Sequence, residues 1–277
     1  MIAVFEPWRR YIRKAIAILI MISLLSILVL PQERAVAATS ELSFSNTGGF
    51  YSSAFQVELS SNVPDSKIYY TLNNTEPDPL KVGNGTILYE APISIYDKSP
   101  EANIYSSLKV FGSTFQLGSN VKIPKCTVVK ACAVSNTYQT PTLTNSYFID
   151  PLKETKFNLP VFSLTTDPAN LYDATKGLFV NETLQDSTVL TDYEKPLHVE
   201  YFDESGTQIL NQNTGVRLHG NSTKNLPQKT LRLYAKSDYD PLNTKFNYEF
   251  FPWMKDIQGN PITSFKRLLL RLSLIHI

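Results

Sequence analysis

Histidine and cysteine are scarce in this sequence, which has two cysteines and three histidines among 277 residues. It contains no CxxC or HExxH pattern and no histidine cluster. Zinc sites in proteins draw most of their ligands from these two residue types. We therefore predict no metal site built on His or Cys.

Charge is also sparse, and neither sign dominates. Charged residues make up 18% of the chain, with 26 Lys and Arg against 25 Asp and Glu. Residues 1–37 hold five of the basic and two of the acidic residues, so the remainder is close to neutral. Recognition of nucleic acid requires a basic field. We expect no nucleic-acid partner.

Both cysteines, Cys126 and Cys132, lie in one stretch that is typical of a β-strand. Six residues of extended chain separate their Cα atoms by about 20 Å. A disulfide requires a separation of less than about 7 Å. The sequence therefore predicts no intrachain disulfide, but two small buried thiols on one face of a strand.

Long hydrophobic runs are missing except at the N-terminus, where residues 15–30 are apolar apart from two serines. Four basic residues between positions 9 and 14 precede this run, and Pro31 and the small residues at 35–37 follow it. This order is typical of a secretory signal. We predict a signal helix within residues 1–37 and a secreted or cell-surface protein. An uncleaved signal anchor in the membrane is the alternative.

The last six residues, 272–277, match the translation of the transposon end used in sequencing-library adaptors. We expect them to be adaptor-derived and the natural reading frame to be cut after Arg271, so that the chain is a fragment. The alternative is a genuine apolar strand over residues 265–277.

With 15 Tyr and 15 Phe, the rest of the chain favours strands over helices. Within residues 40–150, short alternating stretches recur between turn residues. The predicted strands cover 55–59, 67–71, 93–96, 121–123, 127–134 and 146–149. This pattern predicts an antiparallel β-sandwich.

Four phrases in this segment resemble the chitobiase/β-hexosaminidase C-terminal-like β-sandwich. They lie at residues 44–51, 68–77, 89–93 and 127–131. The resemblance implies an accessory module, either a spacer or a carbohydrate-binding domain. Asn73 and Asn74 replace the usual Asp-Gly of its turn. The loop acids Asp65, Glu76 and Asp78 are expected to be solvated charges, and we predict no glycoside hydrolysis.

Residues 155–271 also favour a mostly antiparallel sheet. The predicted strands cover 159–165, 195–203, 215–220, 229–234, 246–251 and 265–271. In the second of these, Leu197, Val199 and Tyr201 are predicted to share one face, with His198, Glu200 and Phe202 on the other.

Phrases at residues 159–180, 198–206, 215–236 and 265–271 resemble the CotH (spore-coat protein H) kinase family. The resemblance implies the amino-terminal part of an atypical kinase-like α+β domain, incomplete here. It also implies ATP with Mg or Mn as cofactor for the intact protein, and Ser or Thr of secreted, surface or coat proteins as the acceptor. For the fragment itself we expect no bound cofactor and assign no catalytic residue.

Candidate nucleotide-binding residues surround the loop after residue 219. Backbone N–H groups at Gly220, Asn221 and Ser222 are suited to phosphate oxygens, and Lys229 is placed like the strand lysine of kinases. Arg217 would add positive charge. The alternative is an ordinary hairpin turn beside a solvent-facing lysine.

Together these patterns predict a mainly β protein, with a β-sandwich followed by part of a kinase-like domain. Two functions stay open. The first is an exported ATP-dependent protein kinase, here lacking its catalytic segment. The second is a non-catalytic surface or envelope protein of assembly or adhesion, with carbohydrate as a partner of its sandwich.

Overall fold

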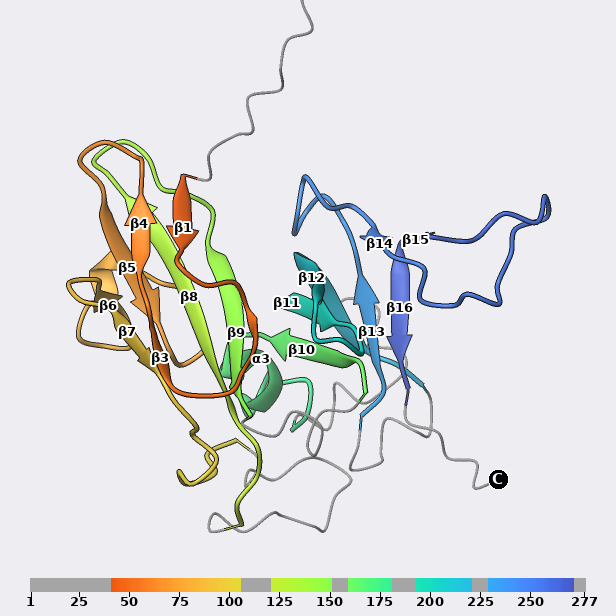
Figure 1. The fold of residues 1–277 in the computed structure, drawn as a ribbon, viewed down its shortest axis with the longest axis horizontal. Helices are drawn as coiled ribbons and strands as arrows, with labels where there is room; N and C mark the ends of the chain where they lie inside the picture. The colour runs from red at the N-terminus through yellow and green to blue at the C-terminus, as the bar shows by residue number, and fades with distance from the viewer. Residues whose placement is uncertain (1–40, 106–120, 151–158, 181–192, 221–228, 272–277) are drawn as a thin grey trace, which may run out of the picture. The chain divides into compact units, whose positions relative to one another are not determined.

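Strands dominate the fold, as the sequence predicted (Figure 1). The computed structural model describes residues 41–105, 121–150, 159–180, 193–220 and 229–271. The predicted signal segment and the last six residues lie outside this range. Among the described residues, no helix is long and apolar enough to span a membrane.

Within residues 41–105 and 121–150, the first part of the fold contains nine strands and one short 3-10 helix. The elements are β1 (Leu42–Phe44), β2 (Gly49–Tyr51), β3 (Phe55–Val57), β4 (Leu59–Ser61), β5 (Lys67–Thr71), η1 (Pro79–Lys81), β6 (Ile87–Leu88), β7 (Ile93–Ile95), β8 (Cys126–Val134) and β9 (Leu143–Ile149).

These strands form a sandwich around one apolar core. A mixed sheet has the order β2-β9-β8-β5-β6, in which β2 runs parallel to β9 and the other pairs are antiparallel. The pairs β1-β4 and β3-β7 supply the residues that cover it. The core contains Leu42, Val57, Leu59, Ile93, Ile95, Val129, Ala131, Ala133, Tyr147 and Ile149. Residues 121–123, predicted as a strand, are not paired; the strand begins at Cys126.

The second part contains an antiparallel sheet of order β10-β11-β12-β13-β16. Its elements are β10 (Val161–Thr165), α3 (Pro168–Tyr172), β11 (Lys195–Phe202), β12 (Gln208–Leu218), β13 (Leu231–Tyr234), β14 (Phe246–Asn247), β15 (Ser264–Phe265) and β16 (Arg267–Leu270). Strands β14 and β15 pair separately. The only α-helix in the described ranges is α3, so these residues include no helical part of a kinase.

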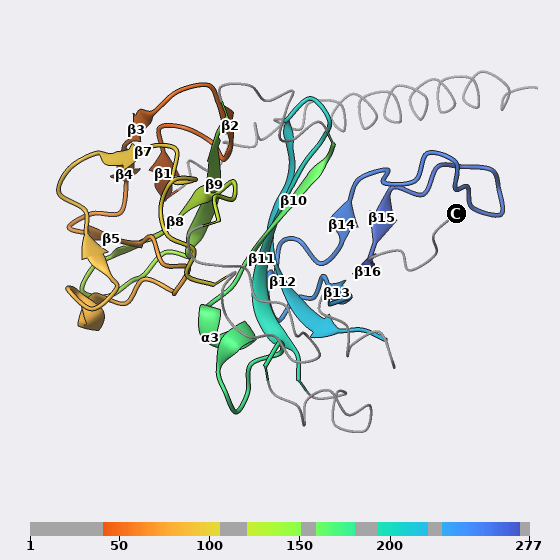
Figure 2. The ribbon, with the colours of Figure 1, turned by 90° about the horizontal axis from the view of Figure 1, so that it is seen from below.

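The two faces of this second sheet differ in character. Leu197, Val199 and Tyr201 lie in an apolar core with Val216, Leu218, Leu233 and Leu268. His198, Glu200 and Phe202 lie on the opposite face, as their alternation predicted. Figure 2 shows the long strands β10, β11 and β12 side by side.

The polar face of the second sheet contacts strands β8 and β9 of the sandwich. Ser146 bonds through its hydroxyl to that of Ser163 (2.8 Å), and its backbone N–H donates to Oε1 of Glu200 (3.1 Å). The rings of Phe50, Phe148 and Phe202 pack together, with centroids 4.8–5.9 Å apart. We call this layer of contacts the interlayer.

Candidate functional site

The hairpin of β12 and β13 brings together the two ends of the predicted phosphate loop. The register pairs Leu218 with Leu231, and the backbone N–H of His219 donates to the carbonyl of Thr230 (2.8 Å). Gly220 and Lys229 are the next residues outward from this hydrogen-bonded pair. Gly220 has φ +109°, a conformation that side chains disfavour, so glycine is required at this bend. Asn221 and Ser222 lie outside the described residues.

Lys229 is half-buried, and this burial lowers the pKa of its ammonium to about 8. The alternation of the strand puts Lys229 on the same face as Leu231 and Leu233. Both leucines pack in the apolar core, which explains the loss of hydration. An anion beside this amine would favour its charged form.

Arg217 lies on the other face of the hairpin, opposite Arg232. Its Nε donates to Oε2 of Glu194 (2.8 Å), and Lys236 donates to both oxygens of the same carboxylate (2.6 and 2.8 Å). Three cationic groups, from Arg217, Lys236 and Arg267, lie over the ring of Tyr234 at 5.0–5.5 Å. Gly220 and Lys229 therefore lie next to the closing hydrogen bond of one hairpin, whereas Arg217 belongs to a separate ionic cluster.

His219 belongs to the face of Arg217. Its imidazole lies 2.5 Å from a guanidinium nitrogen of Arg232. Burial, and then the charges of Arg232 and Arg271, lower the pKa of His219. The neutral ring accepts the hydrogen bond, so His219 helps to hold this cationic side chain in place.

A second candidate site is a cavity of about 390 Å³ in the interlayer. Its walls come from both sheets and from the start of α3. The polar residues that line it are Glu76, Lys130, Thr142, Thr144, Thr165, Thr166, Asp167, Asn170, His198, Asn213, Thr214, Asp238 and Tyr239.

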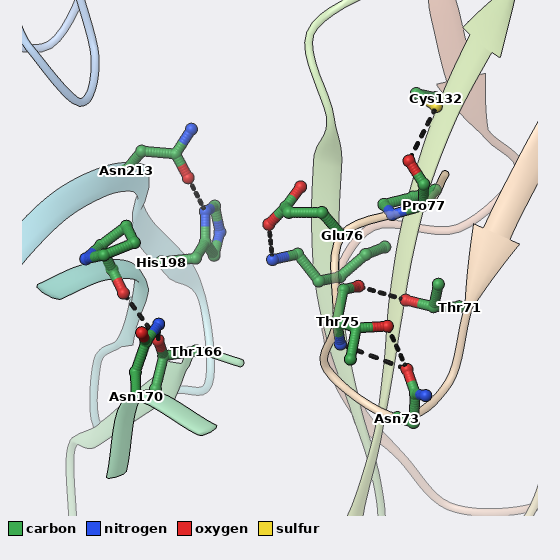
Figure 3. A network of polar contacts seen from close by, with 12 residues as sticks. Thr71, Asn73, Thr75, Glu76, Pro77, Cys132, Thr166, Asn170, His198 and Asn213 are labelled. Carbon is green, nitrogen blue, oxygen red and sulfur yellow. Dashed lines mark hydrogen bonds and ion pairs between the residues drawn. The ribbon is translucent and has the colours of Figure 1, made fainter. Parts of the chain in front are cut away.

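The cavity contains an ion pair between Lys130 of β8 and Glu76 (Figure 3). The side chain of Lys130 is 6% exposed, whereas that of Glu76 is 64% exposed. Glu76 was predicted to be a solvated loop acid, and it is largely exposed. Its carboxylate nevertheless neutralises a buried ammonium, which would otherwise be costly to remove from water.

His198 lies on the opposite side of the cavity, on β11. Its Nδ1 is 2.9 Å from Oδ1 of Asn213, which fixes the orientation of the ring. Burial lowers the pKa of His198 to about 4, so the imidazole is neutral at pH 7. The alternation of residues placed His198 on one face with Glu200 and Phe202 but suggested no role for it, because its environment depends on β8, distant in sequence.

Glu200 is the second buried ionisable group of the interlayer. Oε1 accepts hydrogen bonds from the backbone N–H of Ser146 and from Nε2 of Gln208 (2.8 Å). Burial outweighs these bonds and raises the pKa of Glu200 to about 7. Gly48 packs against this carboxylate so closely that an added Cβ would lie 2.5 Å from Oε1.

The two cysteines are free, as predicted, and both lie on β8; Cys132 is buried as expected, whereas Cys126 is half-buried. Burial raises the pKa of each thiol to about 11. Neither is therefore a thiolate at neutral pH. Among the described ranges, no group of three or more His, Cys, Asp or Glu side chains is arranged to hold a metal ion.

One family model, described as Fn3 associated, matches residues 57–147. The match falls within the sandwich and supports a β-sandwich-type module there. No curated protein and no solved structure matches the chain.

Proposed function

We propose that this chain is an exported protein in which the sandwich precedes the nucleotide-covering part of a CotH-type kinase domain. In the intact protein that domain would transfer phosphate from ATP, with Mg or Mn, to Ser or Thr of secreted or surface proteins. Support for export comes from the signal-like residues 1–37. Support for the kinase comes from the phrases within residues 159–271.

One observation carries the nucleotide site. Gly220 and Lys229 directly flank the hydrogen-bonded pair His219–Thr230, and burial partly desolvates the amine of Lys229. Kinases combine a glycine-containing turn with a strand lysine that holds the phosphates. In this proposal backbone N–H groups of the loop would bind phosphate oxygens, and the amine of Lys229 would supply the positive charge.

Because we expect the fragment itself to bind no cofactor, binding of a fluorescent ATP analogue is measured on the intact gene product that contains residues 41–271. We expect Lys229→Met to weaken binding at least tenfold, because it removes the positive charge proposed to hold the phosphates. Lys266→Met is the matched control, because Lys266 is an exposed lysine just before β16. Equal binding by Lys229→Met and the unaltered chain, or no binding by either, would overturn the nucleotide site.

The pH dependence of binding sharpens the same test. The pKa of Lys229 is about 8 in the unliganded protein, so its amine loses charge as pH rises from 7 to 9. Affinity for the nucleotide should fall over this range. The Lys229→Met variant should show a weaker dependence, since its side chain does not titrate.

A non-catalytic role in surface assembly is the second candidate function. The observation that favours it is the interlayer, whose buried hydrogen bonds and packed rings join the two parts into one unit suited to a structural role. The residues that follow Arg271 in the gene discriminate between the two. Acidic residues able to hold Mg or Mn favour the kinase, and neutral residues in their place favour assembly.

A further inference from the structure

The interlayer cavity contains a buried acceptor without a partner. Nε2 of His198 makes no hydrogen bond to any described residue, and the residue is buried, with only 5% of its surface exposed. Figure 3 shows the imidazole of His198 held by Asn213 on one side, with Glu76 across from it. An unsatisfied buried polar atom costs about 1–3 kcal/mol. A ligand that donates a hydrogen bond at this point would remove that cost.

The hydrogen bond to Asn213 sets the chemistry of the free nitrogen. Oδ1 of Asn213 accepts, so Nδ1 of His198 donates and carries the ring's proton. In the neutral ring Nε2 is then an acceptor. The group that it recognises is a donor such as a hydroxyl.

The charges around the cavity argue against an anionic ligand. Lys130 is paired with Glu76, and Asp167 and Asp238 add two further carboxylates to the lining. The lining therefore carries more negative than positive charge. An anion that entered the cavity would lose its hydration, and no unpaired positive charge among the described residues of the lining would compensate for that loss.

Size and polarity favour a small molecule rich in hydroxyl groups. A volume of about 390 Å³ falls in the range of about 300–1,000 Å³ that ligand pockets occupy. Threonine hydroxyls, the amides of Asn170 and Asn213 and the ammonium of Lys130 line it. These groups offer both donors and acceptors at several points of the wall.

We propose that this cavity binds an uncharged, polyhydroxylated molecule of the size of a monosaccharide, one of whose hydroxyls donates to Nε2 of His198. The site is independent of the nucleotide site at Gly220 and Lys229. It uses residues of both parts of the fold, so neither part would bind this ligand alone.

Saturation-transfer NMR with the full chain tests the proposal. The probes are glucose, galactose, mannose, N-acetylglucosamine and myo-inositol, with glucuronate as the anionic comparison. We expect transfer to at least one neutral probe and at least tenfold weaker binding of glucuronate than of glucose. His198→Phe, which removes the acceptor, should weaken binding of the neutral probe at least tenfold.

A second variant keeps the test decisive if His198→Phe does not fold. Thr142→Trp places a large ring at the partly exposed wall of the cavity and should abolish binding, with little change in thermal stability. The matched control is Thr137→Trp, at an exposed threonine outside this cavity, which should bind like the unaltered chain. The proposal fails if none of the five neutral probes binds, if Thr142→Trp binds normally, or if glucuronate binds as tightly as glucose.

Discussion

The mixed sheet of the sandwich has two buried faces of opposite character. On one face, Val129 and Ala131 of β8 meet aliphatic residues of the pairs β1-β4 and β3-β7. On the other, Lys130 of the same strand and Ser146 of β9 meet the polar face of the second sheet. One strand thus contributes to an apolar core and to the polar interlayer.

The difference shows how each contact is stabilised. Burial of an aliphatic side chain contributes about 1.5–3 kcal/mol and needs no particular partner atom. A buried hydrogen bond contributes about 0.5–1.5 kcal/mol net, and each polar group requires a partner in the correct place. The apolar core can therefore close completely, whereas the interlayer keeps a cavity and two ionisable groups with shifted pKa values.

The largest expected effect is a truncation in the apolar core. Ile95→Ala removes a fully buried side chain of β7 and should lower the free energy of unfolding by about 2–5 kcal/mol. Urea unfolding measures it. Ile257→Ala is the control, because Ile257 is 97% exposed and its loss should change stability by less than about 0.5 kcal/mol. If both variants lost the same stability, β7 would not belong to the core.

The interlayer should respond to pH at Glu200. Its pKa is 4.5 in the unfolded chain and about 7 in the fold, so stability falls by about 3 kcal/mol as pH rises between these values. Glu200→Gln cannot ionise. Its free energy of unfolding should equal that of the unaltered protein at pH 4 and exceed it by up to about 3 kcal/mol at pH 8. Glu204→Gln, at an exposed glutamate, should show no such gain.

His198 should produce the opposite slope. Its pKa falls from 6.5 to about 4 on folding, so the unfolded chain takes up a proton first and stability drops by about 3 kcal/mol on acidification. Between pH 4.5 and 6.5 this slope opposes that of Glu200, so the unaltered protein should show a flat profile there.

The variant His198→Asn keeps a donor for Asn213 but does not titrate. Its stability should fall as pH rises from 4.5 to 6.5, because the slope of Glu200 alone remains. Thermal unfolding at several pH values measures this. A flat profile in His198→Asn would show that the two residues do not carry the pH dependence of the interlayer.

The smallest effect is expected at the ionic cluster of β12. Glu194 is 8% exposed and holds Arg217 and Lys236. Glu194→Gln should cost about 1–2 kcal/mol at pH 7, because it weakens charge-assisted hydrogen bonds. Glu249→Gln is the control, since Glu249 and Lys255 form an exposed pair at 3.8 Å that should contribute little. Chemical denaturation of both variants compares them.

The sequence predicted what depends on short-range periodicity. The alternation at residues 197–202 gave both faces of β11 correctly, and the spacing of Cys126 and Cys132 excluded a disulfide. The first half of β12, residues 208–214, was not predicted because it is polar. Gln212 and Thr214 are buried there and bond to the carbonyls of Asn243 and Tyr234, which no local pattern reveals.

For the candidate sites too, short-range relations could be predicted from the sequence and long-range contacts could not. Gly220 and Lys229 could be brought together from the sequence because a hairpin joins them. The partner of Arg217 could not be predicted, since Glu194 precedes a different strand. The cavity was missed for a similar reason: Lys130 and Glu76 are 54 positions apart, and His198 belongs to the other sheet.

The aromatic contact of Phe50, Phe148 and Phe202 has a practical consequence for work with this protein. Cutting the chain between β9 and β10 would leave two of these rings on one product and the third on the other, each newly in water. The first product would expose an apolar surface at Phe50 and Phe148 beside the hydroxyl of Ser146. The second would expose Phe202 beside the hydroxyl of Ser163 and the carboxylate of Glu200. Deletion series should therefore keep β2 through β12 intact.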